Sequence, residues 1–190
     1  MMQKALSNPA ELYEAAIKHT SKIFVGVKPS QYKDSTPCDK WNVQQLMEHI
    51  TGGLGLAVAS FAGADVTMED HDIAKGGITV EHYNRASKRA VEVIKKPGAM
   101  SKPIKTPLGE MPGAQFAGIL FMDQLVHGWD LAKATKQDTT FPKELAEAAY
   151  AMFAPQFANL QKSGAFKPSI PVPASASAQV KLLAGLGRKA

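Results

Sequence analysis

The chain has 190 residues, 45% hydrophobic and 21% charged, which predicts one domain with a real core and excludes a wholly disordered chain. The net charge is +5, but the lysines are spread along the sequence and no basic run is interleaved with aromatic residues. This distribution does not favour nucleic-acid binding. A mildly basic surface instead suits anionic small molecules.

The redox and membrane signals point to a cytoplasmic protein. Cys38 is the single cysteine, so an internal disulfide is excluded and a reducing compartment is expected. The first residues, MMQKALSNPAELYEAA, contain no apolar signal core. No stretch approaches the roughly 20 apolar residues that a membrane-spanning helix needs. We therefore expect no membrane association.

The first helix is expected from Pro9 to about Val27. Asn8 stands before it as a good N-cap, and the proline occupies the first turn, where its missing N–H costs nothing. Helical patterning then continues until a proline-containing segment follows.

The second helix is expected to begin after Asn42 and to end near Gly63. Gln45 stands three residues after Asn42, which is a form of capping box. Trp41, just outside the helix, is placed to pack as a hydrophobic staple. Residues 64–77 follow as a polar connection.

Three longer segments and a short one complete the predicted elements. A third helix starts near residue 79 and stops before the Pro-Gly pair at 97–98. Residues 97–113 contain four prolines and three glycines, which predict an ordered loop with a short extended piece. Further helices are expected at about 114–135, 142–160 and 178–186. No convincing alternating strand pattern occurs, so the fold class is all-α.

Two polar residues interrupt the apolar stripe of the helix at 114–135. Asp123 and His127 stand at helical spacing among residues that otherwise belong in a core. A carboxylate there is costly unless it is hydrogen-bonded, paired or bound to metal. The i, i+4 spacing lets both side chains converge on one cation. A buried Asp–His hydrogen bond that only stabilises the bundle is the alternative.

His49 supplies a third candidate metal ligand. It borders the inward stripe of the second helix, and an acid–histidine pair on another helix needs such a partner. Three protein ligands plus water describe an open, catalytic-type zinc site. Nickel, iron and manganese are alternatives for this donor set. The nearby glycines at 52, 53 and 55 allow either close helix packing or space for a ligand beside the histidine.

The remaining polar residues have weaker claims. Asp130, three residues after His127, either orients the imidazole as an outer hydrogen-bond acceptor or lies at the bundle edge. His19 is assigned to core packing, with a fourth ligand as the alternative. Trp129 is assigned to packing, and Cys38 to a small buried hydrophobic position. Two further histidines are expected to be solvated: His71 and His82.

Four segments carry a resemblance to a known family. They read TPCDKWNV at 36–43 (followed by Leu46 and His49), PLGEMPG at 107–113, D-xxx-HGWDLA at 123–132 and LLAGLGR at 182–188. In this order they resemble actinobacterial DinB-like proteins, which are related to the metal-binding domain of mycothiol-dependent maleylpyruvate isomerase. The resemblance covers almost the whole chain.

The resemblance implies a DinB-like four-helix bundle with an additional C-terminal helix. It implies a single metal-binding domain over 1–190, with the bundle at about 8–135 and the C-terminal helix and tail at 136–190. The family takes its ligands from the positions of His49, Asp123 and His127. The isomerase has glutamate at the position of the aspartate, and it carries a separate C-terminal domain for which this chain is too short.

Three readings of the function follow. The family chemistry implies a thiol-dependent S-transferase, in which mycothiol or a similar small thiol binds the metal and adds to a small electrophile. The lysine-bearing loop at 97–113 and Arg188 are candidates for thiol contacts, with packing or solvation as the alternative. A non-enzymatic metal- or ligand-binding module for stress response or regulation is the second reading. A metal-free structural network is the third, and homodimers are common in the wider superfamily.

Overall fold

The computed structural model describes residues 8–65, 67, 78–164 and 166–190. The described chain divides into two compact units, Asn8–Thr139 and Thr140–Ala190. The expectation of one domain over 1–190 stays a prediction. His71, expected to be solvated, lies outside the described residues.

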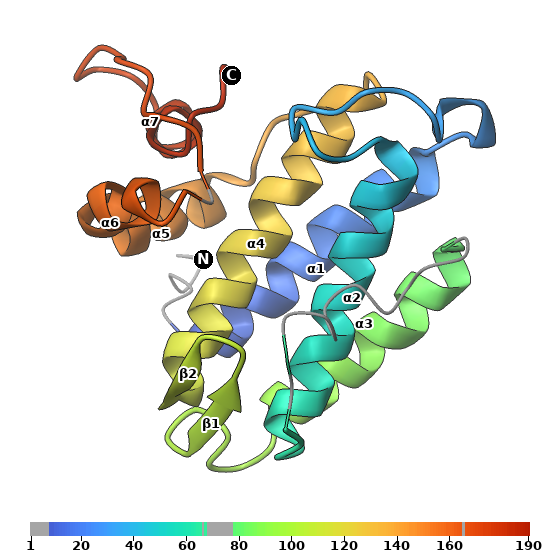
Figure 1. Ribbon diagram of the computed structural model, residues 1–190, viewed down its shortest axis with the longest axis vertical. Helices are drawn as coiled ribbons and strands as arrows, with labels where there is room; N and C mark the ends of the chain where they lie inside the picture. The colour runs from blue at the N-terminus through green and yellow to red at the C-terminus, as the bar shows by residue number, and fades with distance from the viewer. Residues whose placement is uncertain (1–7, 66, 68–77, 165) are drawn as a thin grey trace, which may run out of the picture. The chain divides into compact units, whose positions relative to one another are not determined.

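Four helices build the first unit: α1 (Pro9–Gly26), α2 (Val43–Phe61), α3 (Val80–Ile94) and α4 (Gly113–Ala134). Helices α1 and α2 each pack against both α3 and α4, and the four lie side by side in Figure 1. A single 3-10 turn, η1 (Pro29–Gln31), follows α1. The expected helical fold is thus confirmed in this unit, with each start within one residue of its predicted position.

Side-chain caps explain where three of these helices begin. Asn8 accepts a hydrogen bond from a first-turn N–H at 2.9 Å. Asn42 and Gln45 form the expected reciprocal capping box, with bonds of 2.9 and 3.0 Å. Thr79 and His82 form another, with bonds of 3.2 and 3.4 Å. His82 is exposed, as predicted, but its ring also satisfies a backbone donor that the helix leaves unpaired.

A β-hairpin precedes α4 and modifies the all-α expectation. Strands β1 (Pro103–Thr106) and β2 (Gly109–Pro112) pair antiparallel, and Figure 1 shows them at the N-terminal end of α4. The Thr106 hydroxyl donates to the Gly109 carbonyl at 2.7 Å, and Gly109 adopts a φ of +102° that favours glycine. The prolines suggested a loop, but Pro103 and Pro112 stand at the strand ends, where few ladder hydrogen bonds are lost, and Pro107 lies in the turn.

A buried hydrogen-bond network ties α4 to α1 and α3. The Gln124 amide donates to the Tyr83 hydroxyl at 2.8 Å, and that hydroxyl donates to the carbonyl of Ile17 at 3.1 Å. Thr20 donates to the Gln124 carbonyl at 3.1 Å. Burial raises the pKa of Tyr83, so its hydroxyl keeps its proton. Because Gln124 adjoins Asp123 in the chain, the network fixes the rotation of α4 at the candidate site.

The second unit contains α5 (Lys143–Phe153), η3 (Ala154–Gln156), α6 (Phe157–Lys162) and α7 (Ala178–Gly185). The expectation of one helix over 142–160 was wrong, because Pro155 has no N–H for the α-helical ladder and a 3-10 turn replaces it. The short closing helix at 178–186 is confirmed as α7. None of the described helices is long and apolar enough to cross a bilayer.

Two glycines on different faces of the bundle should respond oppositely to alanine. A Cβ at Gly128 would lie 2.5 Å from the Thr20 hydroxyl, whereas a Cβ at Gly55 would meet nothing within 4 Å. In urea denaturation of metal-free protein, we expect Gly128→Ala to cost about 1–3 kcal/mol through overpacking. Gly55→Ala should stabilise by up to about 1 kcal/mol through helix propensity. Equal effects at the two positions would contradict the close approach of α1 and α4.

Candidate metal centre

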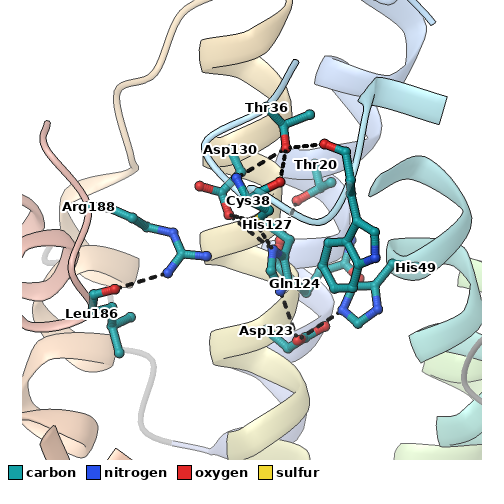
Figure 2. Close-up of polar contacts among 11 residues, drawn as sticks. Thr20, Thr36, Cys38, His49, Asp123, Gln124, His127, Asp130, Leu186 and Arg188 are labelled. Atoms are coloured by element: carbon teal, nitrogen blue, oxygen red, sulfur yellow. Dashed lines mark hydrogen bonds and ion pairs between the residues drawn. The ribbon is translucent and has the colours of Figure 1, made fainter. Parts of the chain in front are cut away.

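The three predicted ligands converge between α2 and α4. Nε2 of His49 lies 3.6 Å from Oδ1 of Asp123, and Nε2 of His127 lies 3.4 Å from the same oxygen. One ligand atom from each residue lies within 4.8 Å of the other two. Figure 2 shows the aspartate between the two imidazoles. The structure brings the trio together, and its assignment as a metal site stays a prediction.

The spacing of these atoms suits a tetrahedral cation. Two nitrogen or oxygen ligands, each about 2.0–2.1 Å from zinc, lie about 3.3–3.4 Å apart at the tetrahedral angle. The distances of 3.4 and 3.6 Å from Asp123 Oδ1 to the two histidine nitrogens differ from this edge by a few tenths of an ångström. The two edges that meet at Asp123 are therefore close in length to those of a zinc site, and the two histidine nitrogens lie within 4.8 Å of each other.

The burial of the polar residues differs from the expectation of a polar pair in the middle of a core face. The Asp123 side chain is 27% exposed, and the His127 side chain is 13% exposed. Solvent therefore reaches the carboxylate. Asp130, by contrast, has no exposed surface. The alternative that Asp130 lies at the bundle edge is therefore wrong, because its side chain points into the protein.

Asp130 and Cys38 meet the opposite edge of the His127 ring. Oδ2 of Asp130 lies 3.0 Å from Nδ1 of His127, the contact expected of an orienting acceptor. The Cys38 thiol donates to the same carboxylate oxygen at 3.1 Å and lies 3.6 Å from Nδ1. The expectation that Cys38 is a buried hydrophobic residue was wrong, because it is half-buried and its sulfur joins a polar cluster.

The segment between α1 and α2 carries Cys38 and Trp41 to the site. The Thr36 hydroxyl donates to the Trp41 carbonyl at 2.8 Å and accepts from the Cys38 amide at 3.1 Å. The Trp41 amide in turn donates to the Cys38 carbonyl at 2.9 Å. The side-chain amide of Gln31 donates to the backbone carbonyl of Thr135, at the end of α4, at 3.1 Å. These bonds hold the segment in one conformation beside α4.

Trp41 forms an aromatic wall of the candidate centre. Its ring stacks on His49, with centroids 4.1 Å apart and an interplanar angle of 29°. It also meets the His127 ring edge at 5.5 Å. Sequence reasoning treated Trp41 only as a staple for α2. Its position within the 36–43 motif, together with Cys38, was the signal that could have placed both residues at the site.

The His127 ring is strongly polarised by its neighbours. Burial lowers its pKa, but the charge of Asp123 and the hydrogen bonds to Asp130 and Cys38 outweigh this and raise the pKa to about 10. A cation bound at Nε2 must displace a proton that these carboxylates stabilise. Proton and metal ion therefore compete for the same nitrogen.

His19 and Trp129 belong to neither of the two ligand clusters found among the described residues. His19 is half-buried, and burial, with a further contribution from Lys22, lowers its pKa. Trp129 is 2% exposed, as expected for a packing residue. Arg188, in the second unit, donates to the carbonyl of Leu186 at 3.3 Å.

Comparison with known proteins gives close relatives of unassigned function and a structural neighbour. Two Mycobacterium tuberculosis proteins of uncharacterised function, MT0763 of strain CDC 1551 and Rv0738 of strain H37Rv, are each 34% identical to the chain over 185 residues. In each case the match covers 95% of this chain and 98% of the relative. No protein-family model matches the chain.

The solved mycothiol-dependent maleylpyruvate isomerase shares the fold. Its crystal structure superposes with a TM-score of 0.60 and 14% sequence identity, covering 76% of this chain and 68% of that chain. A histidine-to-alanine mutant of the same enzyme gives a TM-score of 0.61. The relation expected from the sequence motifs is thus confirmed at the level of the fold.

The raised pKa of His127 should make the metal-free protein less stable as pH rises. The folded state holds this proton more tightly than the unfolded chain, so its stabilisation is complete below about pH 6.5 and is lost towards pH 10. Between pH 7 and 9, the unfolding free energy in chelator should fall by up to about 1.4 kcal/mol per pH unit.

Denaturant titrations of wild type and His127→Gln test this slope. The variant should lose most of it, because glutamine does not titrate. Parallel pH profiles for the two proteins would show that His127 does not hold a stabilised proton.

Proposed function

The chain belongs to the same family as the two Mycobacterium tuberculosis proteins, and we propose that it binds one divalent metal ion as a thiol-dependent S-transferase. The convergence of His49, Asp123 and His127 carries this proposal. Zinc is the first choice for this donor set, and nickel, iron or manganese would use the same residues. The unit Asn8–Thr139 would be the DinB-like metal-binding bundle.

Each residue of the site has a distinct task in this proposal. His49 and His127 present nitrogen ligands from two helices, and Asp123 supplies the oxygen and a negative charge between them. Asp130 accepts a hydrogen bond from the Nδ1–H group of His127, which leaves the Nε2 lone pair directed at the cation. Trp41 holds the His49 ring by stacking. Contacts with Asp130 and Trp41 thus hold the two histidine rings in position before a metal binds.

A small thiol fits the coordination that the protein leaves incomplete. Three protein ligands are one fewer than the four of a closed structural zinc site. When bound, the cation would favour the thiolate form of a thiol at that position. The partly exposed Asp123 side chain gives small molecules a route to the centre. Mycothiol is the first thiol to test, because the isomerase that shares the fold is mycothiol-dependent.

The co-substrate would be a small electrophile, since a thiolate reacts at an electron-poor carbon. The net charge of +5 favours anionic molecules of this kind. The single, half-buried thiol of Cys38 suits a reducing cytoplasm.

Ligand variants test the metal site and the activity together. We expect zinc-loaded wild type to retain near-stoichiometric metal on elemental analysis and to accelerate mycothiol addition to a small electrophile. His127→Ala should lower zinc affinity by more than the about 10–100-fold loss typical of an outer-shell change, and should return the reaction to its uncatalysed rate. Asp123→Glu should keep most of the metal, because it keeps the carboxylate.

His82→Ala is the matched control, since it removes an exposed histidine outside the site. It should keep both metal and activity. Stoichiometric zinc in His127→Ala would overturn the ligand assignment. Tight zinc binding that depends on the trio, without thiol transfer to any electrophile, would instead indicate the non-enzymatic binding module.

A further inference from the structure

A second group of potential ligands lies beside the first and uses the other nitrogen of His127. Sγ of Cys38, Nδ1 of His127 and Oδ2 of Asp130 all lie close together: the sulfur is 3.6 Å from the nitrogen and 3.1 Å from the oxygen, and the nitrogen–oxygen distance is 3.0 Å. We call these three residues the thiolate cluster. In Figure 2, Cys38 and Asp130 lie at the edge of the His127 ring that faces away from Asp123.

The dimensions of the thiolate cluster are close to those of a tetrahedral metal site. With a metal–sulfur bond of about 2.3 Å and a metal–nitrogen bond of about 2.0–2.1 Å, the sulfur–nitrogen edge is about 3.5–3.6 Å. The distance between Cys38 and His127 already has this value, at 3.6 Å. The other two edges are hydrogen-bond lengths, and an expansion of about 0.3–0.5 Å would reach metal-site values.

The chemistry of the cluster selects a different cation from the first site. Sulfur is a soft, polarisable ligand that prefers thiophilic metals, whereas the His49–Asp123–His127 set has no sulfur. Binding replaces the thiol proton of Cys38 by the metal and releases that proton to solvent. Thiolate and Asp130 carboxylate then neutralise a divalent charge in a place where the carboxylate has no exposed surface.

The surrounding bonds hold the sulfur in position. Thr36 fixes the turn that carries Cys38, and α4 fixes the other two ligands three residues apart on one face. Cys38 is half-buried rather than enclosed in the core. A thiol held beside a buried carboxylate and an imidazole nitrogen differs from an isolated surface cysteine.

We propose that Cys38, His127 and Asp130 form a second metal site, selective for soft, thiophilic cations and mutually exclusive with the first. A neutral imidazole has one lone pair and one N–H. If Nε2 binds a metal, Nδ1 carries the ring proton and donates a hydrogen bond to Asp130. If Nδ1 binds a metal, Nε2 carries the ring proton. As long as the ring stays a neutral imidazole, one ion therefore excludes the other, and a soft cation switches the proposed zinc-dependent function off.

Cadmium titration with ultraviolet detection tests the proposal, because a thiolate–cadmium bond gives a charge-transfer absorption. Metal-free wild type should develop this band at one equivalent, and zinc should suppress it competitively. Cys38→Ser should lose the band but keep zinc. His49→Ala should lose zinc but keep the band, which separates this site from the first. If wild type bound no zinc but still developed the cadmium absorption band, only the proposed function would be contradicted, and the second site would stand.

Asp130→Asn distinguishes the cluster from a lone thiol. Loss of this ligand should lower the affinity for cadmium at least about tenfold, which is no less than the effect of removing a residue that only hydrogen-bonds to a ligand. Unchanged cadmium affinity in Asp130→Asn would show that Asp130 is not a ligand and would overturn the proposed three-residue site. Disappearance of the band in His49→Ala would overturn it too, since cadmium would then require the first site. Circular dichroism confirms that each variant is folded.

Discussion

The imidazole of His127 lies between two opposing sets of partners, and the geometry of the candidate centre depends on this position. Nε2 faces Asp123 at 3.4 Å, and Nδ1 faces Asp130 at 3.0 Å and the Cys38 sulfur at 3.6 Å. Two carboxylates around one ring raise its pKa in spite of burial. The same negative charge that holds a proton can hold a cation. The site is therefore electrostatically prepared for positive charge at either ring nitrogen.

The rest of the bundle maintains this arrangement. The network from Thr20 through Gln124 to Tyr83 fixes the rotation of α4, while Gly128 lets α1 approach closely. On the other side, the ordered segment before α2 brings a thiol and an indole against the two imidazoles, with Thr36 at its centre. Hydrogen bonds from Thr20 and Thr36 to backbone carbonyls fix how α4 and the segment before α2 are oriented, which local helix geometry alone does not determine. Fold and site therefore share the same contacts.

Periodicity in the sequence was sufficient for the parts of the site that lie on helices. Asp123 and His127 follow from their spacing on an apolar stripe, and His49 from its place on another. Caps and glycines likewise placed the helix ends. Cys38 was misassigned, and the place of Trp41 at the site was not foreseen, because an irregular segment has no period from which its side-chain directions follow. Within residues 97–113 a short extended piece was expected, but the pairing of two strands was not, because the prolines there resemble loop signals. A proline inside the fifth helix did carry a readable break signal, which the helical pattern around it obscured.

X-ray absorption spectroscopy at the zinc edge of the zinc-loaded protein, without added thiol, tests the central claim most directly. The claim is that His49, Asp123 and His127 hold the metal through two imidazole nitrogens and one carboxylate. We expect only nitrogen and oxygen scatterers, at about 2.0–2.1 Å, with the multiple-scattering pattern of two imidazoles. A sulfur scatterer at about 2.3 Å would contradict it, because the zinc would then lie against Cys38 on the other side of the His127 ring.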